Sequence, residues 1–467
     1  MVFSSAIFLF GFLPLTLTIY YLVPKKIRNY ILLFFSLIFY AWGGPKFLLV
    51  MLAIVFANYL CALLVDRYRK SAKLFLMIGI IISLGVLSYF KYTNFYIETF
   101  NNVFNLDMSA LNIVLPIGIS FFTFQAMSYL IDVYRKKVKV QKNPLLVLLY
   151  VSLFPQLIAG PIVRYEDVEK EITKRNVTVS DFTEGLERFI LGFAKKIIIA
   201  NQMGRLADIV FDSSTINTPI AWLGAIAYMA QIYFDFSAYS DMAIGIGRML
   251  GFHFLENFNF PYISKSITEF WRRWHISLST WFRDYVYIPL GGNKKGTKRQ
   301  IINLAIVWIL TGLWHGASWN FVLWGIYYLV ILLLEKFVLK KVLNKLPSFL
   351  AHIYSLIIIL FGWVLFRCET LQGCINFIKT MIIPTFNASL NGQALVYLET
   401  YYPYFILAII FSMPIYKFII NEISKIKNRK IFAALNILKY IGLVALFLLS
   451  IAFLTQSSYN PFIYFRF

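Results

Sequence analysis

The chain has 467 residues, of which 60% are hydrophobic and 14% charged, and its mean hydropathy is +0.70. About a quarter of the residues in soluble domains are charged, so this composition excludes a string of soluble domains and indicates one membrane-embedded unit over residues 1–467. The net charge of +22 resides in short loops between apolar runs, which is typical of membrane proteins that contact anionic lipids and excludes nucleic acid as a partner.

The first five predicted helices alternate across the membrane. The run Val2–Val23 has no basic residue before it and no evident cleavage site, so it is predicted to span rather than to be a removed signal. It ends in Lys25 and Lys26, which assigns that end to the cytoplasm and the N-terminus to the outside. Helices are then expected at 30–43, 46–65, 74–90 and 111–133, with basic clusters at 67–73 and 135–142 and an external, asparagine-rich connection at 94–109.

The middle of the chain is less regular. Residues 145–163 are apolar but interrupted by Pro155, Gly160 and Pro161, which predicts a bent or re-entrant segment. The mixed-charge stretch 164–188 and the amphipathic stretch 189–211 are expected along the cytoplasmic interface, before a long apolar helix or helix pair at about 219–250. Residues 262–300 are basic and aromatic, and they predict an amphipathic or re-entrant unit that faces the cytoplasm.

Further helices are predicted at about 301–315, 319–334, 350–367, 403–420 and 431–456. The basic segment Lys417–Lys430 is assigned to the cytoplasm, so the last helix leads outward and the tail 456–467 is external. The sequence therefore predicts an all-α polytopic protein with about eleven transmembrane helices plus re-entrant or interfacial helices, and with both termini outside the cytoplasm.

Two of the four histidines are the best candidates for chemistry. His315 lies in an apolar run of small and aromatic residues, and an ionisable side chain at membrane depth is costly enough to indicate function rather than a hydrogen-bonded core histidine. His275 directly follows Trp271–Trp274, and tryptophan and arginine also anchor helices at the membrane surface. For His275 the structural and the functional interpretation therefore both stay open.

A buried neutral imidazole could serve as the general base in acyl transfer to a hydroxyl, which is the role predicted for His315. The developing oxyanion also needs donors, and the candidates are His275, Asn257, Ser277 or an indole N–H such as that of Trp274.

Carboxylates in apolar segments could support such a base. Asp235 and Asp241 lie six residues apart, and Asp132 lies in another apolar run; they either orient a histidine or pair with an arginine. No close grouping of histidine, cysteine and carboxylate predicts a metal site, and the three cysteines have neither zinc spacing nor a disulfide framework.

The stretch Ser266–Tyr285 resembles the signature of the membrane-bound O-acyltransferase family, and Tyr287–Asn293 is similar to its alginate O-acetylation branch. The resemblance extends over essentially the whole chain and is densest between about 112 and 326. The other matching segments are Pro116–Gln125, Gly160–Ile162, Tyr233–Ser237 and Leu313–Gly316.

This resemblance implies an all-helical fold around a central funnel, with His315 as the catalytic histidine and His275 as the second functional histidine. The funnel would be supported by Trp274, Ser277, Asp235, Asn257 and Arg283. It also implies a bacterial cell membrane enzyme without a bound cofactor, which uses acetyl-CoA as its cytoplasmic donor. The acetyl group would reach an extracytoplasmic polysaccharide with the help of a separate acetyltransferase that resembles SGNH hydrolases.

The C-terminal segment Tyr459–Phe467 resembles the tyrosine motif of a small accessory protein in the related D-alanylation systems, in which the tyrosine is thought to carry the acyl group. Transferred to this chain, Tyr464 would be an acyl relay, since a phenol with a pKa near 10 is a better leaving group than an alkanol. An interfacial aromatic anchor is the alternative interpretation.

Other functions were weighed against acetyl transfer. A transporter or flippase would also have many helices, but corresponding broken helices in two halves are not evident. A structural scaffold for a surface-polymer complex would not need His315 for its role. Among acyltransferases, D-alanyl transfer to teichoic acid is the alternative, whereas Ile288–Asn293 and a tyrosine tail within the same chain favour acetyl transfer.

Overall fold

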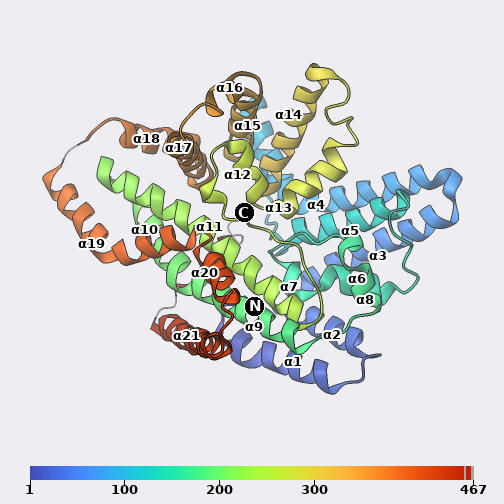
Figure 1. The fold of residues 1–467 in the computed structure, drawn as a ribbon. Helices are drawn as coiled ribbons and strands as arrows, with labels where there is room; N and C mark the ends of the chain where they lie inside the picture. The colour runs from blue at the N-terminus through green and yellow to red at the C-terminus, as the bar shows by residue number, and fades with distance from the viewer. Residues whose placement is uncertain (386, 457–458, 464–467) are drawn as a thin grey trace.

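The computed structural model describes residues 1–385, 387–456 and 459–463, and within them the chain is helical without any β-strand (Figure 1). The all-α prediction is confirmed. By length and composition, six helical stretches among the described residues can cross a membrane: Pro45–Arg67, Arg69–Phe104, Trp319–Leu343, Ser348–Arg367, Ala388–Phe411 and Arg429–Gln456. The predicted total of about eleven spans stays a prediction.

The N-terminal helices pack side by side. They are α1 (Leu13–Leu22, preceded by a π-helical turn Ile7–Phe12), α2 (Arg28–Ala41), α3 (Pro45–Arg67), α4 (Ala72–Phe104) and α5 (Ile119–Tyr134). Helix α4 continues through the asparagine-rich stretch that was predicted to be a connection. The amide of Asn94 exchanges two hydrogen bonds of 2.9 Å with the backbone of Leu111, and Asn101 makes the same pair with Met108 at 2.9 and 3.0 Å. These asparagines therefore hold the following loop against α4 instead of ending the helix.

The centre of the fold is α11 (Thr218–Met249), a single helix where the sequence left a helix or a helix pair open (Figure 1). Before it come α6 (Pro144–Ser152) and α7 (Phe154–Leu157), which show the predicted break, and then α8 (Tyr165–Thr173). Helix α9 (Val179–Ala194) continues through the π-helical turn Lys195–Ala200 into α10 (Asn201–Phe211). A Cβ on Gly185 of α9 would lie 2.6 Å from the carbonyl oxygen of Gly245 on α11, so only glycine allows this close crossing.

Residues 189–211, predicted to lie along the cytoplasmic interface, pack largely against the protein itself. Phe193, Ile197, Met203 and Leu206 of this run are buried, and the run packs against α11. Its amphipathic pattern identifies the side that meets α11, because an apolar stripe pairs with a protein core as readily as with a bilayer.

The second half of the chain contains α12 (Ile267–Arg273), α13 (Ile276–Phe282), α14 (Gly296–His315), α15 (Trp319–Leu334), α16 (Lys340–Leu343), α17 (Ser348–Arg367), α18 (Leu371–Ile382), α19 (Ala388–Phe411), α20 (Ile415–Ser424) and α21 (Arg429–Gln456). A continuous helix over 403–420 was predicted, but α19 begins earlier, contains Pro403 and ends before a turn at 412–414. Pro414 explains the break, because proline lacks an N–H and disfavours a helical conformation in the preceding residue.

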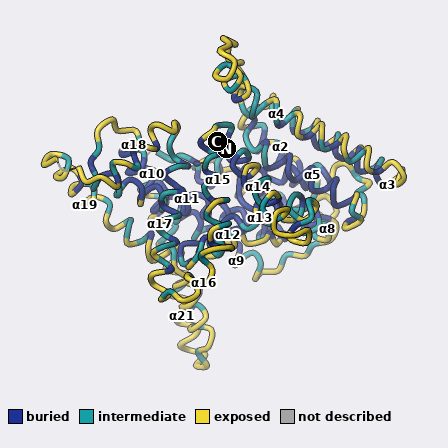
Figure 2. Tube along the Cα trace, turned by 90° about the horizontal axis from the view of Figure 1, so that it is seen from above, coloured by how far each residue is buried: buried dark blue, intermediate teal, exposed yellow. Residues whose placement is uncertain are grey.

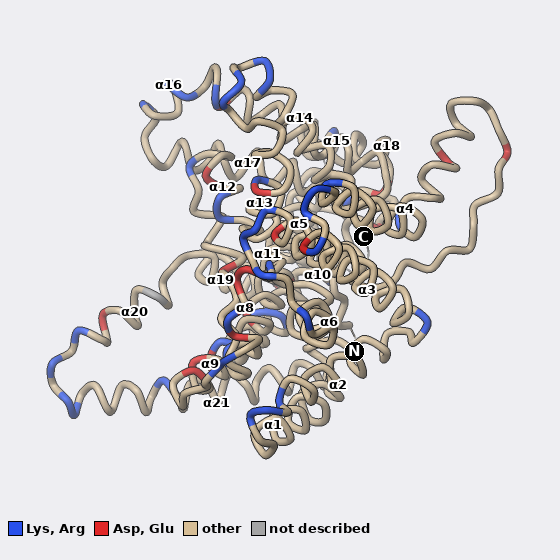
Figure 3. Tube along the Cα trace, turned by 90° about the vertical axis from the view of Figure 1, so that its right-hand side faces the viewer, with Lys and Arg blue, Asp and Glu red and all other residues tan. Residues whose placement is uncertain are grey.

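Buried residues and basic residues are distributed differently over the molecule. The buried residues lie in the middle, whereas α21 and the distal end of α4 are largely exposed (Figure 2). Exposed side chains such as Ile437 and Leu438 on α21 are apolar, as expected for a surface covered by lipid. Most Lys and Arg residues lie toward one side, on the left of Figure 3, while the distal end of α4 and the loop after it carry acidic residues and no basic ones.

Candidate active site

His315 is the last residue of α14, and its side chain is enclosed by protein. It is 6% exposed, and its imidazole meets the rings of Trp324 and Phe366 edge-on, with centroids 5.1 and 5.2 Å apart. Its Nδ1 is buried and has no hydrogen-bond partner among the described residues. Gly312 and Gly325 bring α14 and α15 together at this point, since a Cβ on either would collide with the carbonyl group of the facing helix. The sequence prediction of a buried histidine at this position is therefore consistent with the structure.

A small cavity of about 260 Å³ reaches His315. Its walls also include Lys91 of α4, Ser120 at the start of α5 and the backbone segment 115–119. The Lys91 ammonium donates to the carbonyl oxygen of Trp314 at 2.6 Å and to the Ser120 hydroxyl at 3.4 Å. The basic N-terminus of α14 lies about 28 Å from His315, since nineteen helical residues rise ~1.5 Å each, so the cavity is near the opposite end of that helix.

His275 is buried in a separate hydrogen-bond network. It precedes α13, is 1% exposed, and has a φ of 44°, in the left-handed region that non-glycine residues rarely occupy. Its Nδ1 lies 3.0 Å from Oδ1 of Asn257, which also accepts from the Ser277 hydroxyl at 2.9 Å. The Asn257 amide nitrogen donates to Ser240 on α11 at 3.0 Å. Because Asn257 presents its oxygen to the ring, His275 carries its proton on Nδ1, and Nε2 is left as a lone-pair acceptor without a partner among the described residues.

A buried carboxylate fixes the helix pair that carries His275. Glu335, directly after α15, accepts hydrogen bonds from the backbone N–H groups of Ile267 and Thr268 at 2.6 and 2.8 Å and from the Thr268 hydroxyl at 2.6 Å. These groups are at the N-terminus of α12, where the backbone donors of a helix have no internal partner and an anion is stabilised. Ser266 completes the cap by accepting from the N–H of Glu269 at 3.0 Å.

Aromatic rings connect the two histidines. The indole of Trp314 has its centroid 5.8 Å from the His275 ring and 5.0 Å from the His315 ring. Phe236 of α11 meets His275 edge-on at 4.6 Å. Trp274, the residue before His275, is 3% exposed and packs against Trp363 at 4.7 Å. The structure thus brings together four of the predicted residues, namely His275, Asn257, Ser277 and Trp274, and links them to His315 through one indole.

Asp235 has a different partner from those predicted. It pairs with Lys196 at 2.6 Å rather than with a histidine or an arginine, and its other oxygen accepts from the backbone N–H of Ile463 at 2.8 Å. Lys196 in turn donates to the carbonyl oxygen of Pro461. This buried ion pair therefore holds the backbone of the C-terminal segment, and the predicted role in orienting a histidine has no contact to support it.

The described part of the C-terminal segment lies inside the protein. Phe462 and Ile463 are buried, and the ring of Phe462 lies 4.7 Å from that of Tyr239 on α11. The Asn460 amide donates to the backbone of Ser4 at 2.9 Å, which ties the two ends of the chain together. Tyr464 follows at once but lies outside the described residues.

Arg283 lies apart from the other predicted residues. Its side chain is 60% exposed and pairs with Asp284 at 2.7 Å, and Asp284 also pairs with Arg164 at 3.1 Å. Partial burial raises the pKa of Asp284, but the hydrogen bond from Arg283 and the two guanidinium charges outweigh it, so the pKa is lower than usual. Arg283 therefore belongs to a surface ion-pair network.

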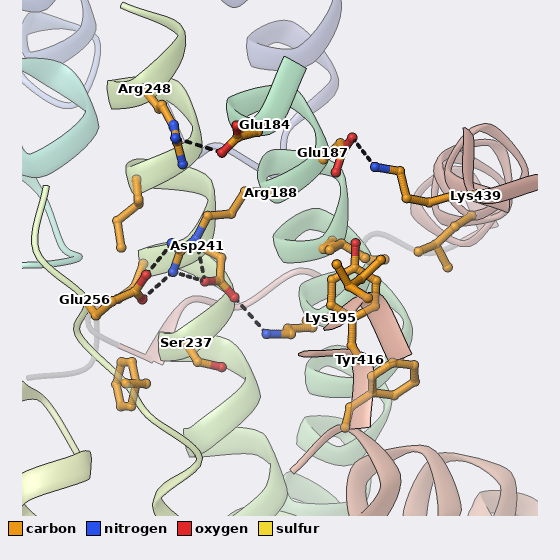
Figure 4. A pocket seen from close by; sticks show the side chains of 18 of the residues that line it. Glu184, Glu187, Arg188, Lys195, Ser237, Asp241, Arg248, Glu256, Tyr416 and Lys439 are labelled. Carbon is orange, nitrogen blue, oxygen red and sulfur yellow. Dashed lines mark hydrogen bonds and ion pairs between the residues drawn. The ribbon is translucent and has the colours of Figure 1, made fainter. Parts of the chain in front are cut away.

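A second, larger cavity of about 1090 Å³ lies among α9, α11, α20 and α21 (Figure 4). Ser240 and Asn257 line it, so it adjoins the His275 network, and His315 is not among its lining residues. Every basic residue labelled in Figure 4 is paired with a carboxylate, so none of these residues offers an unpaired positive charge to an anionic ligand. The pairs are Arg188 with Asp241 and Glu256, Lys195 with Asp241, Arg248 with Glu184, and Lys439 with Glu187.

Three residues of this region were missed by the sequence analysis. Lys91 follows the predicted helix end at 90, where a lysine is easily taken for a surface residue. Glu335 and Lys196 lie in or beside apolar runs. A charged residue among apolar neighbours needs a buried partner, so this placement could have indicated that both residues form buried contacts. Within the described residues, no group of three or more histidine, cysteine or acidic side chains is arranged to hold a metal ion.

Comparison with known proteins gives the class of this enzyme. The membrane-bound O-acyltransferase family model matches residues 140–374. The chain is 46% identical over 379 residues to a probable alginate O-acetylase of Azotobacter vinelandii, covering 80% of this chain and 76% of that protein. It is 34% identical over 439 residues to a peptidoglycan O-acetyltransferase of Helicobacter pylori (85% and 82% covered), and 32% identical over 275 residues to a teichoic acid D-alanyltransferase of Bacillus subtilis (55% and 69% covered).

The chain therefore belongs to the membrane-bound O-acyltransferase family. It is an enzyme, an O-acyltransferase, as the sequence motifs predicted.

Proposed function

We propose that this enzyme takes an acetyl group from a cytoplasmic thioester, acetyl-CoA, and moves it across the membrane for O-acetylation of an extracytoplasmic polysaccharide. The observation that carries the proposal is the enclosed imidazole of His315 beside a cavity. The similarity to the alginate and peptidoglycan enzymes supports acetyl as the group and a polysaccharide as the acceptor. The exposed basic residues Lys294, Lys295, Lys298 and Arg299, just before and within the first turn of α14, suit the phosphates of the donor.

His315 acts as the general base. It takes the proton of the attacking hydroxyl as the new C–O bond forms, and the proton passes to the thiolate when the C–S bond breaks. His275 supports this step as a hydrogen-bond acceptor through Nε2, because Asn257 holds its proton on Nδ1. Enclosure by aromatic rings excludes water, which would otherwise hydrolyse the thioester.

Tyr464 is the first acceptor in this proposal and carries acetyl to the outer face. The ion pair of Asp235 and Lys196 supports it by holding the residues immediately before Tyr464 in the interior. Asp235 and Phe236 are consecutive residues of α11, so the helix that anchors Ile463 also contacts His275. A separate acetyltransferase of the SGNH-hydrolase type then completes delivery to the polymer.

The proposed orientation places the basic side of Figure 3 in the cytoplasm of a bacterial cell. Both chain termini are then extracytoplasmic, in line with the hydrogen bonds between Ser4 and Asn460 that keep the two ends together. The cavity at His315 lies toward the outer side, because α14 runs to it from the basic residues 294–299.

The test is mass spectrometry of the purified chain after incubation with isotope-labelled acetyl-CoA, comparing the parent with His315→Ala and Tyr464→Phe. The proposal predicts labelled acetyl on Tyr464 in the parent and in neither variant. Label that stays on Tyr464 in His315→Ala contradicts the role of the base. Polymer acetylation that is unchanged in Tyr464→Phe contradicts the relay.

D-alanyl transfer is the second candidate function, since 32% identity to a teichoic acid D-alanyltransferase supports it. Supplying a D-alanyl thioester carrier in the same experiment separates the two, because only the correct donor leaves an acyl group on the chain. A transporter or flippase would acylate no residue and would release no thiol.

A further inference from the structure

Lys91 occupies an unusual place for a lysine. It lies twenty residues into α4, one of the helices long and apolar enough to span a membrane, and it borders the cavity that His315 also lines. A charged side chain at this depth is costly, so it is retained only where a specific interaction stabilises it. The sequence analysis assigned it no role.

The contacts of Lys91 leave part of its ammonium group unused. An ammonium has three N–H donors. One donates to the Trp314 carbonyl at 2.6 Å, and a second makes a longer bond of 3.4 Å to Ser120. Among the described residues, no carboxylate forms an ion pair with Lys91. Its charge therefore lies at the cavity wall without an anion to neutralise it.

We propose that Lys91 is a catalytic residue that binds the carbonyl oxygen of the acyl group during transfer. This inference rests on the proposed function of His315. In the step, the attacking hydroxyl oxygen bonds to the carbonyl carbon while His315 takes the hydroxyl proton. The carbonyl π electrons move to oxygen, which becomes an oxyanion and accepts a hydrogen bond from the Lys91 ammonium. The oxyanion then re-forms the double bond, the thiolate leaves, and it takes the proton from His315.

The cavity has the dimensions and the chemistry for this step. At about 260 Å³ it is slightly smaller than the ~300–1,000 Å³ of sites that hold whole small molecules, so it suits an acetyl group together with its acceptor hydroxyl. His315 and Lys91 both line it, so the base and the cation border the same space. A preorganised cation stabilises an oxyanion better than water does, because it does not have to reorient during the reaction.

Capping of α14 is the competing explanation. The carbonyl of Trp314 is one of the last in the helix and lacks an internal partner, and a cation at a helix C-terminus is stabilising. The chain contains a matched control for this role. Tyr92, the next residue, donates its hydroxyl to the carbonyl of Leu313 at 2.7 Å and thus caps the same helix end without a charge.

The experiment measures single-turnover thiol release from acetyl-CoA by the full chain in lipid nanodiscs, for the variants Lys91→Gln, Lys91→Arg and Tyr92→Phe. Here kcat is the maximal rate constant and KM is the acetyl-CoA concentration that gives half of it. Gln keeps an N–H donor for the cap but no charge, and Arg keeps the charge. We expect kcat to fall by about 100-fold in Lys91→Gln with little change in KM, since losing one oxyanion donor costs ~10²–10³ in kcat. Lys91→Arg is expected to retain at least about ten times the kcat of Lys91→Gln, and Tyr92→Phe to stay near the parent.

Three results would overturn the assignment. They are a Lys91→Gln variant as active as the parent, a Tyr92→Phe variant as impaired as Lys91→Gln, or a Lys91→Arg variant no better than Lys91→Gln. Thermal unfolding of each variant identifies loss of the fold, and Lys91→Arg then remains as the variant that keeps the positive charge. The variant His315→Gln separates failure of this inference from failure of the proposed function. If His315→Gln is active, the proposed function fails. If His315→Gln is inactive and Lys91→Gln is active, only the role of Lys91 is refuted.

Discussion

Replacing Asn257 with alanine is expected to disrupt the site that holds His275. The Asn257 side chain is fully buried and connects three partners, since its oxygen accepts from His275 and Ser277 and its nitrogen donates to Ser240. Alanine removes these three hydrogen bonds and a longer one of 3.4 Å from the Ser277 N–H, and it leaves the ring nitrogen and two hydroxyls buried with fewer partners.

The magnitude follows from these contacts. A neutral hydrogen bond contributes about 0.5–1.5 kcal/mol net, so the loss of the three shorter bonds lowers the free energy of unfolding by about 1.5–4.5 kcal/mol. His275 also loses the contact that fixes its proton on Nδ1, and a misplaced catalytic group costs on the order of 10²-fold in rate. Ser240→Ala is the matched control, because it removes only the bond on the far side of Asn257 and is expected to cost about 1 kcal/mol with little effect on rate.

Thermal unfolding in nanodiscs gives the stability of both variants, and thiol release from acetyl-CoA gives their rates. Asn257→Ala should lose both, and Ser240→Ala should lose a little stability alone. If Asn257→Ala kept the parental rate while losing stability, His275 would be a structural residue. If it kept both, the described network would have no energetic importance.

Three further predictions concern groups that hold the site in place. Glu335→Gln should lower the free energy of unfolding by about 1.5–3 kcal/mol, which is the value of a hydrogen bond to a charged group. The control Glu422→Gln, at an exposed position, should change it by less than about 0.5 kcal/mol. Equal effects of the two substitutions in unfolding experiments would contradict the capping role of Glu335. Asp235→Asn leaves Lys196 buried without its anion, which costs about 3–5 kcal/mol of the free energy of unfolding. It should also expose the C-terminal segment to carboxypeptidase, because Asp235 binds the N–H of Ile463. A variant whose tail resists digestion as well as the parent's would show that Asp235 does not hold the segment. Hydrogen bonds from Thr178 lower the pKa of Asp181 to about 2, below its unfolded value near 3.9. The stabilisation by Asp181 is therefore present above about pH 4 and is lost as the pH falls through about 2. The difference in unfolding temperature between the parent and Asp181→Asn should shrink over that range, and a difference that grows there would contradict the assignment.

Much of the fold could be predicted from the sequence because apolar runs and basic loops are local signals. The long helix at 219–250, the break after residue 152 and the start of the last helix near 430 appear where they were expected. The errors arose where tertiary contacts decide the outcome. Asparagines at 94 and 101 indicated a connection, but they hold a loop against α4.

The candidate site could be predicted only in part for the same reason. His275, Asn257 and Ser277 lie within one stretch of sequence, so their proximity was accessible to motif analysis. Lys91 is distant from His315 in the chain, and only the packing of α4 against the end of α14 brings it to the same cavity. Arg283 lies within the motif but faces outward, because position in a motif does not determine the direction of a side chain.

The most direct test of the account is the single-turnover rate of thiol release from acetyl-CoA by the purified enzyme in nanodiscs, for the parent, His315→Gln and His253→Gln. His253 is the control because it is an exposed histidine paired with Glu171 at 2.8 Å, away from both cavities. Loss of a general base predicts a fall of about 10²–10⁴-fold in His315→Gln and none in His253→Gln. A parental rate in His315→Gln would contradict the central claim that this imidazole is the base for acyl transfer.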